Sequence, residues 1–204
     1  MGQEHLGGCR HDGHTFLPDV WDYLLAKYAI RSVVDVGCGY GYAAKYFLDQ
    51  GLDVIGVEGY RLAIEQNRCP KRYLIEHDYT QGPLTIRPVD LAWAGEFVEH
   101  VEARFRDHFL TTFACARYVC LTHAVPGQGG YHHVNEQPTA YWVRELARYG
   151  FRHNEAETAF LRLGGERTPW GRRTLTFFER AGRGGRERGR RWQLRRPGVP
   201  SLSS

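Results

Sequence analysis

The sequence predicts an α/β protein with a doubly wound, mostly parallel, seven-stranded sheet and helices on both faces. Short apolar runs alternate along the chain with segments of helical periodicity. The runs are nearly continuous, which is typical of strands covered on both faces. One of them, Val33–Val36, leads directly into Gly-x-Gly-x-Gly at 37–41. This pattern predicts a buried strand that turns sharply into a helix.

The elements follow from periodicity and from turn residues. Apolar residues at i, i+3 and i+4 predict a first helix over 18–28. Strands are expected at Ser32–Val36, Leu52–Val57, Arg72–Glu76, Val89–Trp93, Ala116–Thr122 and Thr174–Glu179. Further helices are expected at Tyr42–Gln50, Tyr60–Arg68, Glu99–Cys115 and Pro138–Tyr149. We therefore expect a polar lead-in or lid at 1–17, one domain at 18–180 and a tail at 181–204.

Charge is unevenly distributed along the chain. From Arg180 onward there are eight arginines and one glutamate, whereas the preceding residues carry a net charge of −3. The basic tail lacks apolar periodicity, which predicts disorder, and we favour a solvated extension over an RNA-binding one. The five cysteines are odd in number and form no Cys-x-x-Cys pair. Together with the absence of an 18-residue apolar run or an apolar leader, this favours a cytoplasmic protein without a membrane partner. The sequence does not indicate an oligomeric state.

The first two strands predict a nucleoside site. Glu58 ends the second strand, 23 positions after Asp35. In a βαβ unit such an acid lies beside the glycine turn and accepts hydrogen bonds from ribose hydroxyls. The nicotinamide fingerprint needs a third glycine where the chain has Tyr42, which disfavours an oxidoreductase.

The pattern Asp35-x-Gly-x-Gly-x-Gly, followed by Glu58 and Asp78, resembles the class I S-adenosylmethionine-dependent methyltransferases. The resemblance covers roughly residues 20–180 and implies a Rossmann-like methyltransferase fold with S-adenosylmethionine as cofactor. It also implies that Glu58 holds the ribose and Asp78 the adenine amino group. The full set of implied cofactor residues is Asp35, Gly37, Cys38, Gly39, Gly41, Glu58, Gly59, Asp78, Tyr79, Ala94 and Gly95. From the residues alone, an Asp after a strand is as readily a turn former.

The segment Glu96-Phe97-Val98-Glu99-His100 follows the fourth strand. It is similar to the ubiquinone-pathway O-methyltransferases and to the small-RNA 3′-terminal 2′-O-methyltransferases. The second resemblance implies a divalent metal held by Glu96, Glu99, His100 and His133. On a helix, Glu96, Glu99 and His100 would share one face, and a hard cation there would bind vicinal hydroxyls and activate one. In the metal-free alternative the histidine packs near the sulfonium and a glutamate caps the helix.

A second histidine cluster, His123, His132 and His133, follows the fifth strand. Its glycines and proline predict a mobile loop that closes over a substrate. Histidine titrates near neutral pH, so His100, His123 and His133 are the candidate catalytic bases. This stretch also resembles small uncharacterised methyltransferases of phage and bacterial origin.

The leading hypothesis is O-methylation of a hydroxylated small molecule, a sugar or a phenol. The mildly acidic body lacks a basic stripe, which favours such an acceptor over RNA. One alternative is an RNA 2′-O-methyltransferase that uses the metal described above, and Arg172-Arg173 and the tail keep it open. Another is a nucleoside-binding module of the same fold without catalytic activity.

Overall fold

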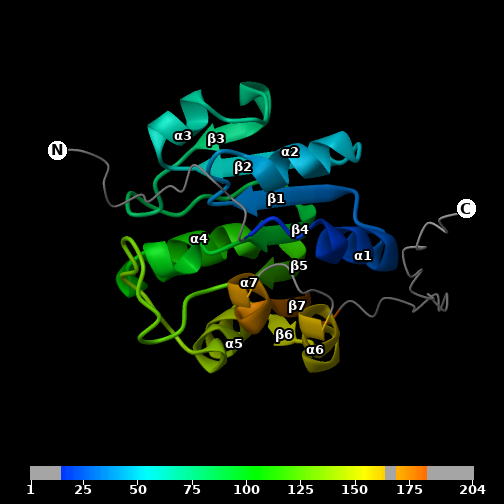
Figure 1. Ribbon diagram of the computed structural model, residues 1–204, viewed down its shortest axis with the longest axis vertical. Coiled ribbons are helices and arrows are strands. Elements are labelled where there is room, and N and C mark those ends of the chain that lie inside the picture. The colour runs from blue at the N-terminus through cyan, green and yellow to red at the C-terminus, as the bar shows by residue number, and fades with distance from the viewer. Residues whose placement is uncertain (1–14, 164–168, 183–204) are drawn as a thin grey trace, which may run out of the picture.

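A seven-stranded sheet organises the molecule, as predicted (Figure 1). The structure is a computed structural model that describes residues 15–163 and 169–182. Strand order is β3-β2-β1-β4-β5-β7-β6. Of these strands, β7 alone runs in the opposite direction to the others, so it pairs antiparallel with both β5 and β6. The strands are β1 (Ser32–Val36), β2 (Asp53–Glu58), β3 (Leu74–Glu76), β4 (Val89–Ala94), β5 (Ala116–Leu121), β6 (Phe151–His153) and β7 (Thr176–Arg180).

Helices cover both faces of the sheet (Figure 1). They are α1 (Pro18–Tyr28), α2 (Tyr42–Asp49), α3 (Arg61–Glu65), α4 (Arg106–Phe113), α5 (Thr139–Arg148), α6 (Glu155–Leu163) and α7 (Pro169–Thr174). One core packs α1, α2 and α6 on the sheet through residues such as Trp21 and Phe47. The other packs α4 and α5 through residues such as Phe109 and Trp142.

Consecutive strand residues enter opposite cores, which explains the continuous apolar runs. Val33 faces the first core and Val34 the second, and both are fully buried. Phe177 and Phe178 of β7 divide in the same way. Side chains alternate across a strand, so a sheet covered on both faces needs apolar residues at successive positions.

Three predicted elements differ from the structure. The helix expected at Tyr60–Arg68 ends at Glu65, because the Arg68 amide donates to the Tyr40 carbonyl (2.9 Å) and turns the chain under the glycine turn. The helix expected at Glu99–Cys115 is replaced by two 3₁₀ turns, η3 (Val98–His100) and η4 (Ala103–Phe105), followed by α4. The strand expected at Arg72–Glu76 begins as a 3₁₀ turn, η2 (Lys71–Tyr73).

The predictions for the lead-in, the tail and the cysteines can be compared with the structure only within the described residues. α1 begins at Pro18 and β7 ends at Arg180, whereas most of the lead-in and of the basic tail lie outside the described residues. The cysteines within the described ranges, Cys38, Cys69, Cys115 and Cys120, carry free thiols. No helix in these ranges is long and apolar enough to cross a bilayer.

Candidate functional site

The turn between β1 and α2 is held open by its glycines. The Gly37 and Cys38 amides donate to the Val57 carbonyl (2.9 and 3.0 Å), which fixes the turn against β2. Gly37 has φ +70°, and a Cβ there would lie 2.2 Å from the Phe97 ring. Gly39 has φ +52°, but a Cβ there would meet nothing within 4 Å. The backbone of Gly39 is therefore open to a ligand.

Glu58 lies at the carboxyl end of β2 and binds this turn. Its carboxylate accepts the Gly39 amide (2.7 Å) and the Tyr60 amide (2.8 Å). Burial raises the pKa of Glu58, while the amides of Tyr60, Gly39 and Gly59 oppose the shift. Glu58 is 7% exposed, so these amides replace the water that burial removes.

A cleft opens at the glycine turn, along the carboxyl ends of the parallel strands. Nine of the eleven predicted cofactor residues line it: Asp35, Gly37, Cys38, Gly39, Glu58, Gly59, Asp78, Tyr79 and Gly95. Ala94 is instead buried at the end of β4. Gly41 faces Asn67, whose Oδ1 would lie 1.9 Å from a Cβ at that position. These two residues are therefore placed outside the cleft.

The sequence reasoning missed Asn67 as a support of the cleft. Its Nδ2 donates to the Gly39 carbonyl (2.7 Å), and its Oδ1 accepts the Cys69 amide (2.9 Å). Lining residues that were also missed include His77 and Phe97. An Asn shortly before Cys-Pro is an ordinary loop residue by composition, so no local signal identifies its role.

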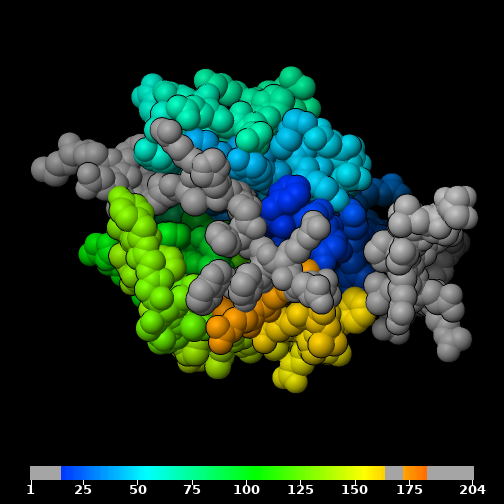
Figure 2. Space-filling view, viewed as in Figure 1, coloured from blue at the N-terminus to red at the C-terminus, as the bar shows by residue number. Residues whose placement is uncertain are grey.

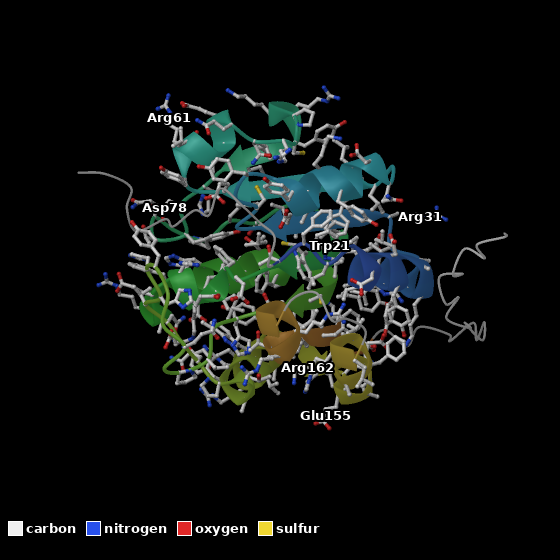
Figure 3. The ribbon with its side chains drawn as sticks, viewed as in Figure 1. Trp21, Arg31, Arg61, Asp78, Glu155 and Arg162 are labelled. Atoms are coloured by element: carbon white, nitrogen blue, oxygen red, sulfur yellow. The ribbon has the colours of Figure 1, made fainter. Side chains whose placement is uncertain are left out.

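Asp78 forms a turn and also lines the cleft. Its Oδ1 accepts the Thr80 amide (2.8 Å), as in an Asx turn, and the residue lines the cleft. Figure 3 shows Asp78 and Arg31 at opposite ends of the sheet. The neighbouring Tyr79 is anchored because its hydroxyl donates to Thr112 Oγ1 (2.9 Å).

Glu96 adopts a left-handed backbone conformation, with φ +47°. Its amide donates to Thr122 Oγ1 (2.8 Å), which draws the chain toward β5 directly after β4. The shared helical face predicted for Glu96, Glu99 and His100 is therefore wrong, because η3 begins at Val98 and does not include Glu96. Glu96 and His100 nevertheless both line the cleft.

Glu99, His100 and His133 meet beside the cleft. One ligand atom of each lies within 4.8 Å of the others, and Glu96 is not part of this group. Glu99 is fully buried, and neither carboxylate oxygen has a hydrogen-bond partner among the described residues. Burial, and then the nearby Glu96 carboxylate, raise the pKa of Glu99 well above its usual range. Burial and the neighbouring His133 lower the pKa of His100 to about 4.

The loop between β5 and α5 brings His133 to this group. The amides of Val134 and Asn135 both donate to the Glu99 carbonyl (3.0 and 3.1 Å), which ties the loop to η3. The His133 and His100 rings lie edge to face, with centroids 5.0 Å apart. In Figure 2 the loop is the yellow-green ridge at the left. His132 lies in the same loop, with φ +54°.

His123 lies away from the cleft, contrary to its expected role as a base. It is 1% exposed, and its Nδ1 and Nε2 lie 3.1 Å from the Ala124 carbonyl and from Thr139 Oγ1. Burial lowers the pKa of His123 to about 4. Both ring nitrogens are engaged, so His123 supports the loop and has no ring nitrogen available for a substrate proton.

Fold and site together define a doubly wound α/β domain with a polar group beside its cleft. Residues 34–114 match the family model described as a methyltransferase domain. This match and the strand order described above support the resemblance to the class I S-adenosylmethionine-dependent methyltransferases that the sequence showed. No curated protein matches the sequence significantly.

Solved structures share the fold at low sequence identity. Magnesium protoporphyrin IX methyltransferase from Synechocystis PCC 6803, with bound S-adenosylhomocysteine, has a TM-score of 0.63 and 14% identity over 88% of this chain and 92% of its own. The methyltransferase domain of bacterial CtHen1 has a TM-score of 0.56 and 15% identity over 79% and 96%. Mitomycin 7-O-methyltransferase has a TM-score of 0.56 and 14% identity over 80% and 53%.

Proposed function

We propose that the domain at 18–180 transfers the methyl group of S-adenosylmethionine to a hydroxyl oxygen of a small molecule, a sugar or a phenol. The observation that carries the proposal is the group of Glu99, His100 and His133 beside the cleft. A cofactor in the cleft and an acceptor at this group would be neighbours, because His100 belongs to both. The sulfonium methyl is already activated, so alignment and deprotonation are the main requirements.

The cleft offers complementary groups to each part of the cofactor. The Glu58 carboxylate has about four acceptor sites, so it retains acceptor capacity for a ribose hydroxyl beside the amides that it binds. Asp78 lies at the next strand end, where it would accept the adenine amino proton. Gly39 exposes backbone where a side chain would obstruct the ligand.

The polar group fits a divalent cation. Two carboxylate oxygens of Glu99 and the Nδ1 of His100 are buried without hydrogen-bond partners among the described residues. Burying such groups unpaired is costly, and a cation would compensate for it. Its chemistry would be to lower the pKa of a hydroxyl that it contacts. Glu99, His100 and His133 would hold it, with Glu96 facing the cleft beside them.

The histidines supply the proton acceptor. With its pKa at about 4, His100 is a neutral imidazole at pH 7, the form that accepts a proton or binds a metal. His133 lies beside it and is a second candidate. In a metal-free enzyme the base is thus one of these two residues, and His123 is withdrawn. With a cation held by both histidines, the cation would instead promote loss of the proton by lowering the pKa of the hydroxyl.

The 2′-hydroxyl of a terminal ribose in RNA is a second candidate acceptor. The same three side chains suit a vicinal diol, and the fold is shared with the CtHen1 methyltransferase domain. The net charge of −3 before Arg180 argues against extensive phosphate contacts, so we rank RNA second.

Calorimetry with S-adenosylmethionine tests cofactor binding, and labelled methyl transfer to sugars, phenols and short RNAs tests the acceptor. RNA with a periodate-oxidised 3′ end separates diol recognition from general RNA binding. We expect Glu99→Gln to lower transfer at least about tenfold, since it removes the carboxylate that would hold the cation. Glu102→Gln, on an exposed side chain three residues away, is the matched control. A folded protein that binds no donor at millimolar concentration rejects the proposal.

A further inference from the structure

One carboxylate organises the loop that carries His133. Glu136 Oε2 accepts the Gly127 amide (2.7 Å), and its Oε1 accepts the Gly129 amide (2.6 Å). The Glu136 side chain is 17% exposed, so the loop largely encloses it. Two backbone amides from the glycine-rich segment thus converge on a residue that follows it in sequence.

The same carboxylate contacts the His133 ring. Glu136 Oε1 lies 3.3 Å from His133 Nδ1. Desolvation acts to raise the pKa of Glu136, but the amides of Gly127 and Gly129 and the His133 ring outweigh it and lower that pKa. Both Glu136 oxygens accept backbone amides, so Oε1 acts as an acceptor toward His133 as well, and His133 Nδ1 donates. The Nε2 atom of His133 keeps its lone pair.

Gly130 packs against one face of the ring. A Cβ at Gly130 would lie 2.4 Å from His133 Nε2 and Cε1, so only glycine allows this approach. The ring is thereby placed between the Gly130 backbone and Glu136, with its centroid 5.0 Å from that of His100.

We propose that Glu136 is a positioning residue that closes the 127–133 loop and fixes the Nδ1–H tautomer of His133. The Nε2 lone pair is then available to the cation that Glu99 and His100 share. This inference rests on the proposed function, since it assumes a cation at that group. A partner of this kind, outside the ligand set, orients the imidazole and selects its tautomer.

The tautomer is testable in the cation-free protein. Long-range ¹H–¹⁵N spectra distinguish Nδ1–H from Nε2–H imidazoles, and His133→Asn assigns the signal. We expect Nδ1–H in the wild-type protein and a shift toward Nε2–H in Glu136→Ala. Gln128→Ala is the matched control, because Gln128 Oε1 accepts one backbone amide of the same loop, that of Val125 (3.2 Å). Its spectrum should match the wild type.

Cation affinity provides the second readout, with Mn²⁺ as the probe. We expect Glu136→Ala to bind Mn²⁺ about 10- to 100-fold more weakly than the wild type. Glu136→Gln should lose less, because it keeps the length and one acceptor oxygen, and Gln128→Ala should lose nothing. Donor affinity serves as the folding check, since Glu136 does not line the cleft. If Glu136→Ala does not fold, Glu136→Gln decides the question.

The outcomes separate the two proposals. A wild-type protein that binds S-adenosylmethionine but no Mn²⁺ rejects the cation, and the Glu136 inference falls with it. A wild-type protein that binds Mn²⁺, with Glu136 variants of unchanged affinity or unchanged His133 tautomer, overturns the Glu136 inference alone.

Discussion

His123 should make the protein less stable as pH falls below neutrality. Burial holds its pKa at about 4, against 6.5 for an exposed histidine. A lowered pKa means that the folded state binds fewer protons than the unfolded state, so the contribution is fully present above pH 6.5 and is lost toward pH 4. A shift of about 2.5 units corresponds to about 3.4 kcal/mol, of which about 2 kcal/mol is lost by pH 5.

Urea unfolding at several pH values between 7.5 and 5 measures this loss in the wild type and in His123→Gln. Glu58 and Glu99 have raised pKa values and act in the opposite sense, but they remain in both proteins and cancel in the comparison. We expect the wild type to lose about 2 kcal/mol more than the variant over this range. Parallel stability curves would refute the reasoning. If the variant does not fold, an NMR titration that places the pKa of His123 near 6.5 refutes it equally.

Two pairs of glycine substitutions test the cleft and the loop. Gly39→Ala and Gly51→Ala place alanine at φ +52° and +78° with no contact within 4 Å, so each should cost about 1–2 kcal/mol of stability. Only Gly39→Ala should weaken donor binding in calorimetry, because Gly39 lines the cleft and its new methyl group would overlap the donor. An overlap that costs about 1.4 kcal/mol would weaken binding about tenfold. Gly130→Ala should displace the His133 ring and weaken Mn²⁺ binding. Gly82→Ala should not, because Gly82 has a matching φ (+153° against +152°) and nothing lies within 4 Å of its Cβ. Equal donor or Mn²⁺ affinities within either pair would contradict these assignments.

The central strands of the fold were predictable because their sequence pattern matches the burial that the folded sheet imposes on them. The runs at β1, β4 and β5 are apolar at successive positions, and these strands are buried on both faces. The three-residue β6 gave no such signal, since only Phe151 of its residues is buried. Its place in the sheet comes from antiparallel pairing with β7, as in Phe151 opposite Arg180, which no local pattern in β6 records.

The cleft was also largely predictable, for a related reason. Residues that directly follow parallel strands meet at one edge of the sheet, so the ends of β1, β2 and β4 bring Gly37, Glu58 and Gly95 together. Asn67 reaches the same turn from beyond the end of α3. Its role depends on where that helix stops, and the sequence reasoning placed that end three residues too late.

Hydrogen bonds between distant parts of the chain, and not the spacing of residues along a helix, bring Glu99, His100 and His133 together beside the cleft. The i, i+3, i+4 pattern of Glu96, Glu99 and His100 suggests a helix, yet the bond from the Glu96 amide to Thr122 Oγ1 holds Glu96 at φ +47° and prevents one. A left-handed non-glycine residue costs about 1–3 kcal/mol and persists only where its surroundings enforce it. Here the result is a Glu96 carboxylate at the cleft and a Glu99 carboxylate turned toward His133. The strain thus lies where β4 and β5 together shape the acceptor side, which is where we place the chemistry.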